Sequence, residues 1–122
     1  MLVAAYLAHP TVAQACSCKP LASIVEISDG IFTGRFTSAD GTNSNFKVEE
    51  TFKGEVGDVI YVSGGDIGSS CYESFDLGAR YLILASRTQS GWITDPYCGA
   101  IKGIGHFFLK MLRQRREGEE KD

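Results

Sequence analysis

The sequence predicts a small, mainly β domain in which five short strands form a barrel, with one helix before the strands and one after them. Runs rich in β-branched and aromatic residues alternate with glycine-containing turns between residues 31 and 94. From residue 101 onward, apolar residues instead recur at helical spacing. A length of 122 residues, about 107 after cleavage of a leader, suits one domain with a modest core.

The first helix is predicted over residues 23–28. Ser23 and Glu26 fit a capping box, in which the serine side chain accepts a hydrogen bond from the first turn and the glutamate reaches back. Gly30 follows closely and is expected to end the helix before the first strand.

The strands are predicted from alternation and from turn dipeptides such as Asp-Gly, Lys-Gly and Ser-Gly. In the second strand one expected face carries Phe46, Val48, Glu50 and Phe52. Glu50 interrupts an otherwise apolar face. Residues 81–85 are apolar on both faces, as expected of a strand covered on both sides. The expected strands are 31–39, 45–52, 59–63, 80–87 and 92–94.

The last helix is expected to pack on the barrel. Its apolar residues are Ile101, Ile104, Phe108, Met111 and Leu112. Gly103 and Gly105 disfavour helix at the start of this segment, so the helix is expected to begin near His106. Residues 117–122 form an acidic, solvated tail, and the domain proper is expected to span residues 16–116.

A leader is predicted over residues 1–15, which carry no Lys, Arg, Asp or Glu and are apolar from residue 2 to residue 8. Ala13-Gln14-Ala15, directly before Cys16, has the small-x-small form of a cleavage site. We therefore expect a signal peptide and a secreted protein, periplasmic or extracellular, whose mature N-terminus is Cys16. A lipoprotein anchor and a retained, buried N-terminal segment are the alternatives. No other run is long enough to span a bilayer, so stable membrane insertion is not expected.

Four cysteines lie at positions 16, 18, 71 and 98, all after the leader, as expected of an exported domain with disulfides. A bridge within the Cys16-Ser17-Cys18 stretch would close a strained ring, so each of its cysteines should reach a distant partner. Two pairings remain open: 16–71 with 18–98, or 16–98 with 18–71. Each bridge should add about 4 kcal/mol of stability. A metal site is disfavoured because the spacing lacks paired C-x-x-C knuckles.

Several classes of function are disfavoured. No basic stripe is long enough to indicate nucleic-acid binding, so proteins or small ligands are the expected partners. The aromatic residues 32, 36 and 46 are expected in the core rather than on an oligonucleotide platform. His106 is the one histidine after the leader, so a Ser-His-Asp triad is excluded, and the acidic residues 66, 73 and 76 are typical of solvated turns. We expect no enzyme activity and no cofactor.

The order of short motifs along the chain resembles the netrin-like module, and within it the N-terminal domain of tissue inhibitors of metalloproteinases. The matching stretches span nearly the whole mature chain. They are Cys16-Ser17-Cys18-Lys19-Pro20, Phe46-Lys47-Val48, Thr51-Phe52-Lys53-Gly54, Ser69-Ser70-Cys71, Arg80-Tyr81-Leu82-Ile83-Leu84-Ala85 and Cys98. The family's third disulfide and its C-terminal subdomain are absent, so this would be a reduced, single-domain relative.

The resemblance implies a five-stranded closed barrel of the OB type with the disulfides Cys16–Cys71 and Cys18–Cys98. It also implies a monomeric inhibitor whose partner is a zinc metalloproteinase. In the family mechanism the amine and carbonyl oxygen of Cys16 would chelate the protease's zinc, and Ser17 would enter the specificity pocket. The other residues implied to contact the protease are Cys18, Lys19, Pro20, Ser69, Ser70 and Cys71.

Chelation in trans is chemically reasonable because a catalytic zinc keeps one position open for water or substrate. The amine must be neutral to bind, and since an α-amine has a pKa of about 8, this costs about 1 kcal/mol at pH 7. One additional residue before Cys16 should abolish chelation. The alternative function is a netrin-like protein-binding module, without inhibitory activity, that uses the barrel face or the last helix.

Overall fold

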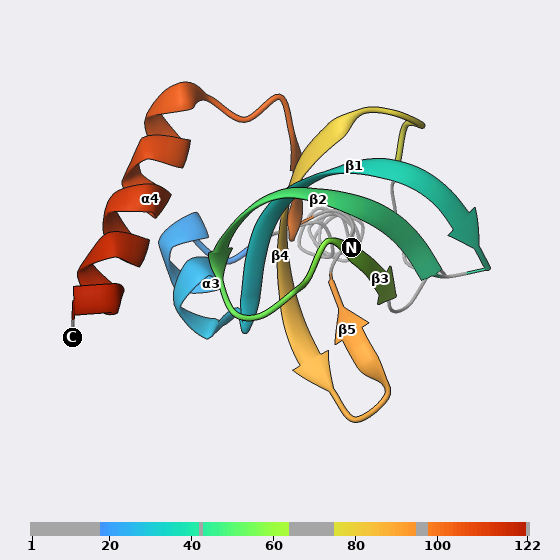
Figure 1. Ribbon diagram of the computed structural model, residues 1–122, viewed down its shortest axis with the longest axis horizontal. Helices are drawn as coiled ribbons and strands as arrows, with labels where there is room; N and C mark the ends of the chain where they lie inside the picture. Colours follow the sequence, from blue (N-terminus) through green and yellow to red (C-terminus); the bar gives the residue numbers. More distant parts are fainter. Residues whose placement is uncertain (1–17, 42, 64–74, 95–97, 122) are drawn as a thin grey trace, which may run out of the picture.

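Six strands and two helices make up the described part of the protein, whose computed structural model describes residues 18–41, 43–63, 75–94 and 98–121. The fold is mainly β (Figure 1). In chain order the elements are α3 (Leu21–Ile27), β1 (Gly30–Asp40), β2 (Asn43–Lys53), β3 (Val59–Ser63), β4 (Arg80–Thr88), β5 (Gly91–Ile93), β6 (Ala100–Lys102) and α4 (His106–Lys121).

Strands β1 to β5 close into a barrel, as the sequence predicted. Each strand pairs with its neighbour in the order β1-β2-β3-β5-β4, and β4 pairs back with β1. All of these pairs are antiparallel except β3 with β5, which are parallel and meet only at Val62↔Trp92 and Ser63↔Ile93. The additional strand β6 pairs with residues 81–83 of β4 on the edge opposite β1.

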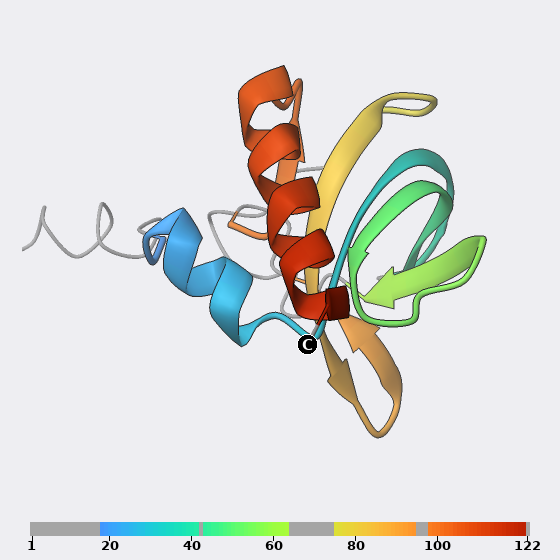
Figure 2. The same cartoon turned by 60° about the vertical axis from the view of Figure 1, so that its left-hand side comes forward.

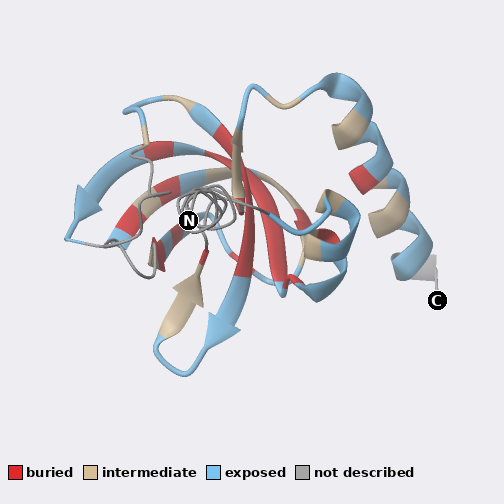
Figure 3. Cartoon of the chain, turned by 180° about the vertical axis from the view of Figure 1, so that it is seen from behind, coloured by how far each residue is buried: buried red, intermediate tan, exposed pale blue. Residues whose placement is uncertain are grey.

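The barrel interior is packed around aromatic rings. Phe46 is fully buried and contacts the rings of Phe32, Phe36, Phe75 and Tyr81 at centroid distances between 5.2 and 6.3 Å. Most of these contacts are edge-on, the arrangement that aromatic quadrupoles favour. The aromatic residues predicted for the core, at positions 32, 36 and 46, therefore do lie there. Figure 3 shows where buried positions lie along the strands of the barrel.

A second apolar cluster lies between the outer face of β4 and the two helices. Its buried members are Val25, Ile31, Phe52, Leu82, Leu84 and Leu112. Residues of β4 alternate between this cluster and the barrel interior, which confirms that the strand is covered on both sides. Figures 1 and 2 show α3 and α4 on the same side of the barrel, and Arg115 of α4 forms a 3.0 Å ion pair with Glu26 of α3.

The predicted capping box is wrong. Helix α3 begins at Leu21, its N-cap is Pro20, and no side chain caps it. The carbonyl of Pro20 accepts hydrogen bonds from the N–H groups of Ser23 (2.9 Å) and Ile24 (3.2 Å), so Ser23 lies inside the first turn. Glu26 does not reach back to the helix start because its carboxylate pairs with Arg115.

The predicted C-terminal helical segment, from residue 101 onward, begins with a strand instead of a helix. Residues 100–102 form β6 rather than a helix, because the free edge of β4 offers them hydrogen-bonding partners. Helix α4 then begins at His106, as the two glycines predicted, and continues to Lys121. It therefore includes most of the predicted acidic tail, and residues 117–119 are exposed. Neither helix in the described residues combines the length and the apolar character needed to cross a membrane.

The prediction that Glu50 shares a face with Phe46 is also wrong. Thr33 of β1 lies opposite Glu50 and Gly34 lies opposite Val48, so Glu49 is an extra residue in β2. Such a bulge turns the following residues toward the other face of the sheet. Phe46 and Val48 consequently face the barrel interior, while Glu50 faces α4.

Glu50 joins β2 to α4 through two arginines. Arg113 donates from Nε to Glu50 Oε2 (2.9 Å) and from Nη2 to Oε1 (2.7 Å), which is a bidentate pair. Arg116 donates to Glu50 Oε2 at 3.2 Å and to the carbonyl of Thr51 at 2.8 Å. Its guanidinium also lies 5.6 Å from the ring centroid of Phe52. The charged cluster therefore holds α4 beside the apolar contacts of Leu112.

We expect the attachment of α4 to weaken in acid. The hydrogen bond from Arg113 lowers the pKa of Glu50, partial burial opposes that shift, and Arg116 adds to it. Because the pKa is lower in the folded protein, the stabilisation is present at neutral pH and is lost as the pH falls through the carboxyl range. Amide exchange in α4, corrected for intrinsic rates, should therefore accelerate between pH 7 and pH 3.

The variant Glu50→Gln should lose most of this acid dependence, because its amide does not titrate. Glu119→Gln is the matched control, since Glu119 pairs with Arg115 one turn away on the same helix and is more than half exposed. Hydrogen exchange followed by mass spectrometry measures all three proteins. An equal acid response of α4 in the native protein and in Glu50→Gln would contradict this role for Glu50.

Candidate functional site

The structure describes three of the residues predicted to form the site, and all three are exposed. They are Cys18, Lys19 and Pro20. The other predicted site residues lie outside the described residues, as do the predicted leader and the predicted bridge between Cys16 and Cys71. These undescribed site residues are Cys16, Ser17, Ser69, Ser70 and Cys71.

Cys18 forms a disulfide with Cys98, and their Cα atoms lie 5.6 Å apart. The bridge joins positions 80 residues apart in the sequence. Of the two pairings left open by the cysteine spacing, this excludes the one in which Cys18 reaches Cys71. The exposed stretch before α3 is therefore covalently attached to the segment that precedes β6.

The segment around Cys98 is fixed on the barrel by Thr94. The hydroxyl of this buried threonine donates to the carbonyl of Leu84 at 2.8 Å and lies 3.3 Å from the carbonyl oxygen of Gly99. Gly99 in turn accepts a hydrogen bond from the N–H of Leu84 at 2.8 Å. The partner of Cys18 is thus adjacent to a glycine that is bonded directly to β4.

Thr94 also connects this region to the end of β3. Its N–H donates to the carbonyl of Ser63 at 2.9 Å, and Ser63 is the last residue of β3. The chain after Ser63 leads into the segment that contains Ser69, Ser70 and Cys71. The structure therefore places the end of β3 at the same end of the barrel as Thr94 and Gly99, next to Cys98. No local pattern marks a lone threonine for this role, so the sequence alone did not identify Thr94.

Helix α3 fixes the other side of the exposed stretch. Because Pro20 accepts the first hydrogen bonds of the helix, the stretch passes directly into α3. Val25 of α3 is buried against the outer face of β4. After the helix, the N–H of Asp29 donates to the carbonyl of Ala85 at 2.9 Å. The residues from Cys18 to Pro20 are thus attached to the barrel at both ends.

Lys53 and Gly54, at the end of β2, contact the C-terminal end of α3 and the residues that follow it. Lys53 Nζ donates to the carbonyls of Val25 and Glu26, both at 3.1 Å, and so satisfies the end of the helix. Gly54 has a φ of +78°, and a Cβ there would meet the carbonyl oxygen of Asp29. Only glycine fits such a position without rearrangement of the backbone.

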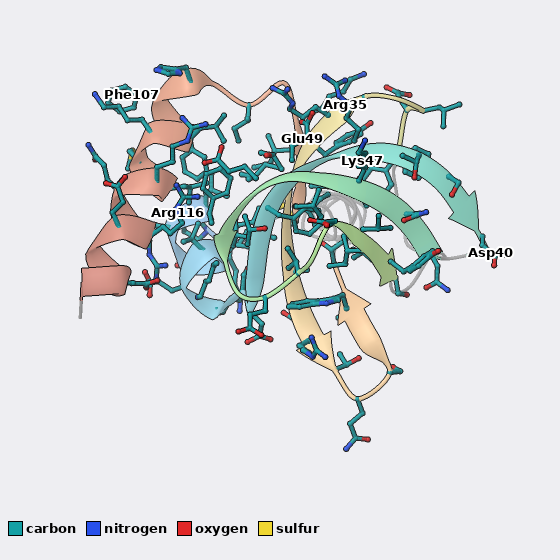
Figure 4. All side chains as sticks on the ribbon, in the orientation of Figure 1. Arg35, Asp40, Lys47, Glu49, Phe107 and Arg116 are labelled. Carbon is teal, nitrogen blue, oxygen red and sulfur yellow. A yellow bond between two sulfur atoms is a disulfide. The ribbon has the colours of Figure 1, made fainter. Side chains whose placement is uncertain are left out.

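A charged cluster that the sequence did not reveal lies on the outer face of β1, β2 and β4. Glu49 accepts from Arg35 Nε at 3.2 Å and from Arg80 Nε at 2.6 Å. Burial raises the pKa of Glu49, but the hydrogen bonds and charges of Arg80 and Arg35 lower it by more. Figure 4 shows Arg35, Lys47 and Glu49 on neighbouring strands. The strand register that brings these residues together is not readable from local sequence.

The described geometry presents three exposed residues, 18–20, that a disulfide and a helix attach to the barrel. Across residues 18–41, 43–63, 75–94 and 98–121, no three His, Cys, Asp or Glu side chains gather closely enough to hold a metal ion. His106 is exposed at the start of α4. The arrangement is therefore that of an exposed segment held by a disulfide, a helix and a buried threonine.

Neither a protein-family model nor a curated protein matches this chain. The class of protein is thus defined by the structure itself, as a mainly β, closed five-stranded barrel with two helices and a disulfide between Cys18 and Cys98.

Proposed function

We propose that this protein is a netrin-like module built on an OB-type barrel. The strand order β1-β2-β3-β5-β4, closed by β1 with β4 and with β3 and β5 parallel, supports this assignment. The disulfide between Cys18 and Cys98 agrees with the pairing that the resemblance implies. The supporting contacts of Lys53 and Gly54 give a physical reason for the Lys-Gly pair in the motif.

Within that class we propose a secreted inhibitor of zinc metalloproteinases that begins at Cys16. The observation that carries the proposal is the disulfide of Cys18 with Cys98, because it attaches the exposed residues 18–20 to the segment that Thr94 and Gly99 bond to β3 and β4. Only Ser17 separates Cys16 from Cys18, so chain connectivity keeps their Cα atoms within about 7 Å of each other. An N-terminal amine at Cys16 would therefore stand at this same end of the barrel.

The second disulfide, between Cys16 and Cys71, is part of the proposal. Cys18 is already paired with Cys98, so it is not available to Cys71. In sequence, Cys71 follows β3, which ends at Ser63, and the carbonyl of Ser63 accepts a hydrogen bond from Thr94. This placement favours a bridge that would hold the N-terminus and the segment after β3 together.

In the proposed mechanism the neutral amine and the carbonyl oxygen of Cys16 replace the water on the protease's zinc. Catalytic zinc sites keep this position open, so no protein ligand has to leave. Ser17 enters the specificity pocket, and the exposed Lys19 and Pro20 continue along the substrate cleft. The two attachments of the exposed stretch reduce the ordering that binding would otherwise require.

A second candidate is a netrin-like protein-binding module without inhibitory activity. Helix α4 favours it, because Phe107 and Met111 are 76% and 51% exposed and lie one turn apart. Figure 4 shows Phe107 directed away from the barrel. Exposed apolar side chains of this kind are common at protein interfaces.

An inhibition assay separates the two candidates. Oxidised protein beginning at Cys16 is tested against a panel of zinc endopeptidases, with serine and cysteine endopeptidases as controls. We expect at least one zinc enzyme to be inhibited with a dissociation constant below about 1 μM, and no control enzyme to be affected. Absence of inhibition by protein with both bridges intact would contradict the proposal and favour the second candidate.

A further inference from the structure

Strand β3 has an edge that β5 covers only in part. On one side β3 pairs with β2 along its whole length, from Val59 to Ser63. On the other side it pairs with β5 through Val62 and Ser63 only. In the part of the chain that the structure describes, residues 59–61 have no strand neighbour on this second side. The parallel closure of the barrel therefore leaves a gap next to the first half of β3.

The backbone of this half-strand directs hydrogen-bonding groups into the gap. The N–H of Val48 in β2 donates to the carbonyl of Asp58, just before β3, at 2.8 Å, so Asp58 directs its main-chain groups toward β2. Since direction alternates along an antiparallel strand, Val59 and Tyr61 direct their main-chain groups away from β2. An exposed edge of this kind is a template for another extended segment.

A groove lies beside this edge, between β3 and the hairpin formed by β4 and β5. Figure 1 shows the hairpin diverging from β3 toward its tip. Val59 and Tyr61 are 55% and 64% exposed, unlike their interior neighbour Ile60. The residues that line the groove include Val56, Val59, Tyr61, Thr88, Trp92 and Ile93. The walls thus offer apolar and aromatic surface along the open backbone edge.

A cation, Arg87, lies beside Trp92, which is one of the residues that line the groove. Arg87 lies directly opposite Trp92 in the hairpin, and its guanidinium carbon is 5.2 Å from the centroid of the indole ring. The main-chain N–H of Arg87 donates to the carboxylate of Asp29. Its guanidinium, however, forms no ion pair with any acidic residue in the described ranges. A carboxylate on a bound segment would complement this charge.

We propose that the open edge of β3 binds an extended peptide segment of a partner protein by strand addition. The segment adds backbone hydrogen bonds to Val59 and Tyr61, places alternate apolar side chains on the groove, and brings an acidic residue to Arg87. A single cation beside Trp92 selects an acidic peptide rather than a nucleic-acid strand, which requires a positively charged groove along its backbone. The surface uses no residue of the N-terminal stretch, so it is independent of the proposed inhibition.

Peptide selection followed by titration tests the proposal. A random heptapeptide library displayed on phage is selected on the immobilised, oxidised full chain, and enriched peptides are synthesised. Trp92 is the one tryptophan in the chain, so its fluorescence reports binding at the groove. We expect enriched peptides to combine alternating apolar residues with a carboxylate. Arg87→Glu should weaken their binding at least about tenfold, whereas Lys110→Glu on α4, the matched charge reversal, should not.

N-methylation of the peptide tests strand addition directly. Two versions are made, each methylated on a different alternate set of amides, so that in an added strand only one set faces β3. One version should bind like the parent peptide and the other at least about tenfold more weakly. Equal binding of both versions, or unchanged binding by Arg87→Glu with a native melting temperature, would overturn the proposal. A selection that enriches nothing would do the same, as would sedimentation showing that a second copy of the chain already fills the edge.

Discussion

Protein that retains Ala15 is expected to inhibit zinc endopeptidases about a thousandfold more weakly than protein that begins at Cys16. The additional residue converts the α-amine of Cys16 into a planar amide, whose nitrogen does not act as a neutral amine ligand. Structural zinc sites with four protein ligands bind with about 10–16 kcal/mol, or roughly 3 kcal/mol per ligand. Without the amine the chelate is lost, so both zinc donors of Cys16, the amine and the carbonyl oxygen, are lost. Water returns to the zinc and offsets part of this loss, so the binding free energy weakens by about 4 kcal/mol, or about a thousandfold in affinity.

The same mechanism sets the sign of the pH dependence. A protonated amine has no lone pair for zinc, so affinity should rise by about tenfold per pH unit up to the pKa of an ordinary α-amine near 8, and then level off. Inhibition constants measured from pH 6 to pH 9 check this, with a small zinc-binding inhibitor used to correct for titration of the protease. The two forms should have the same melting temperature. Equal inhibition by both forms would exclude the amine as a ligand.

Much of the barrel was predictable because its signals are local. Glycine-containing turns separate the strands, and residues 81–85 are apolar on both faces because β4 has the barrel core on one side and two helices on the other. The start of α4 at His106 follows from two glycines that disfavour helix. Each of these features depends on neighbours within a few residues, which is the range over which sequence patterns are informative.

Two features that the sequence missed depend on partners far along the chain, whereas the early start of α3 is local. Three residues form β6 only because an edge of β4 is free, and a strand this short has little signal of its own. The bulge at Glu49 depends on the register between β1 and β2, and it turns Glu50 toward α4. Pro20 begins α3 before the expected cap because its carbonyl accepts the first hydrogen bonds.

The candidate site also combines features that local sequence predicts with features that depend on distant contacts. Spacing indicated that Cys18 has a distant partner, but the choice between Cys71 and Cys98 requires the closed barrel. Cys98 is brought into place by Thr94, which bonds to the end of β3 and to β4. Local patterns therefore locate the cysteines, while the pairing depends on tertiary contacts.

Replacement of Cys18 and Cys98 by serine is expected to lower the free energy of unfolding by about 4 kcal/mol. The bridge joins residues separated by 80 positions, and a loop of that length loses much entropy when it is closed in the unfolded chain. For a domain of about 100 residues this corresponds to a fall in melting temperature of roughly 20 °C. Calorimetry of the oxidised protein and of the double variant measures it, and a fall of only a few degrees would contradict the estimate.

The double variant should also lose inhibition at temperatures where its barrel remains folded, because the exposed stretch before α3 would then be held by the helix alone. Leu112→Ala is the matched control, since Leu112 is buried on the inner face of α4 and its truncation should cost about 2–5 kcal/mol while the bridge between Cys18 and Cys98 remains intact. At equal folded fractions, Leu112→Ala should inhibit like the native protein. If both variants retain inhibition, the disulfide stabilises the barrel but does not position the inhibitory segment.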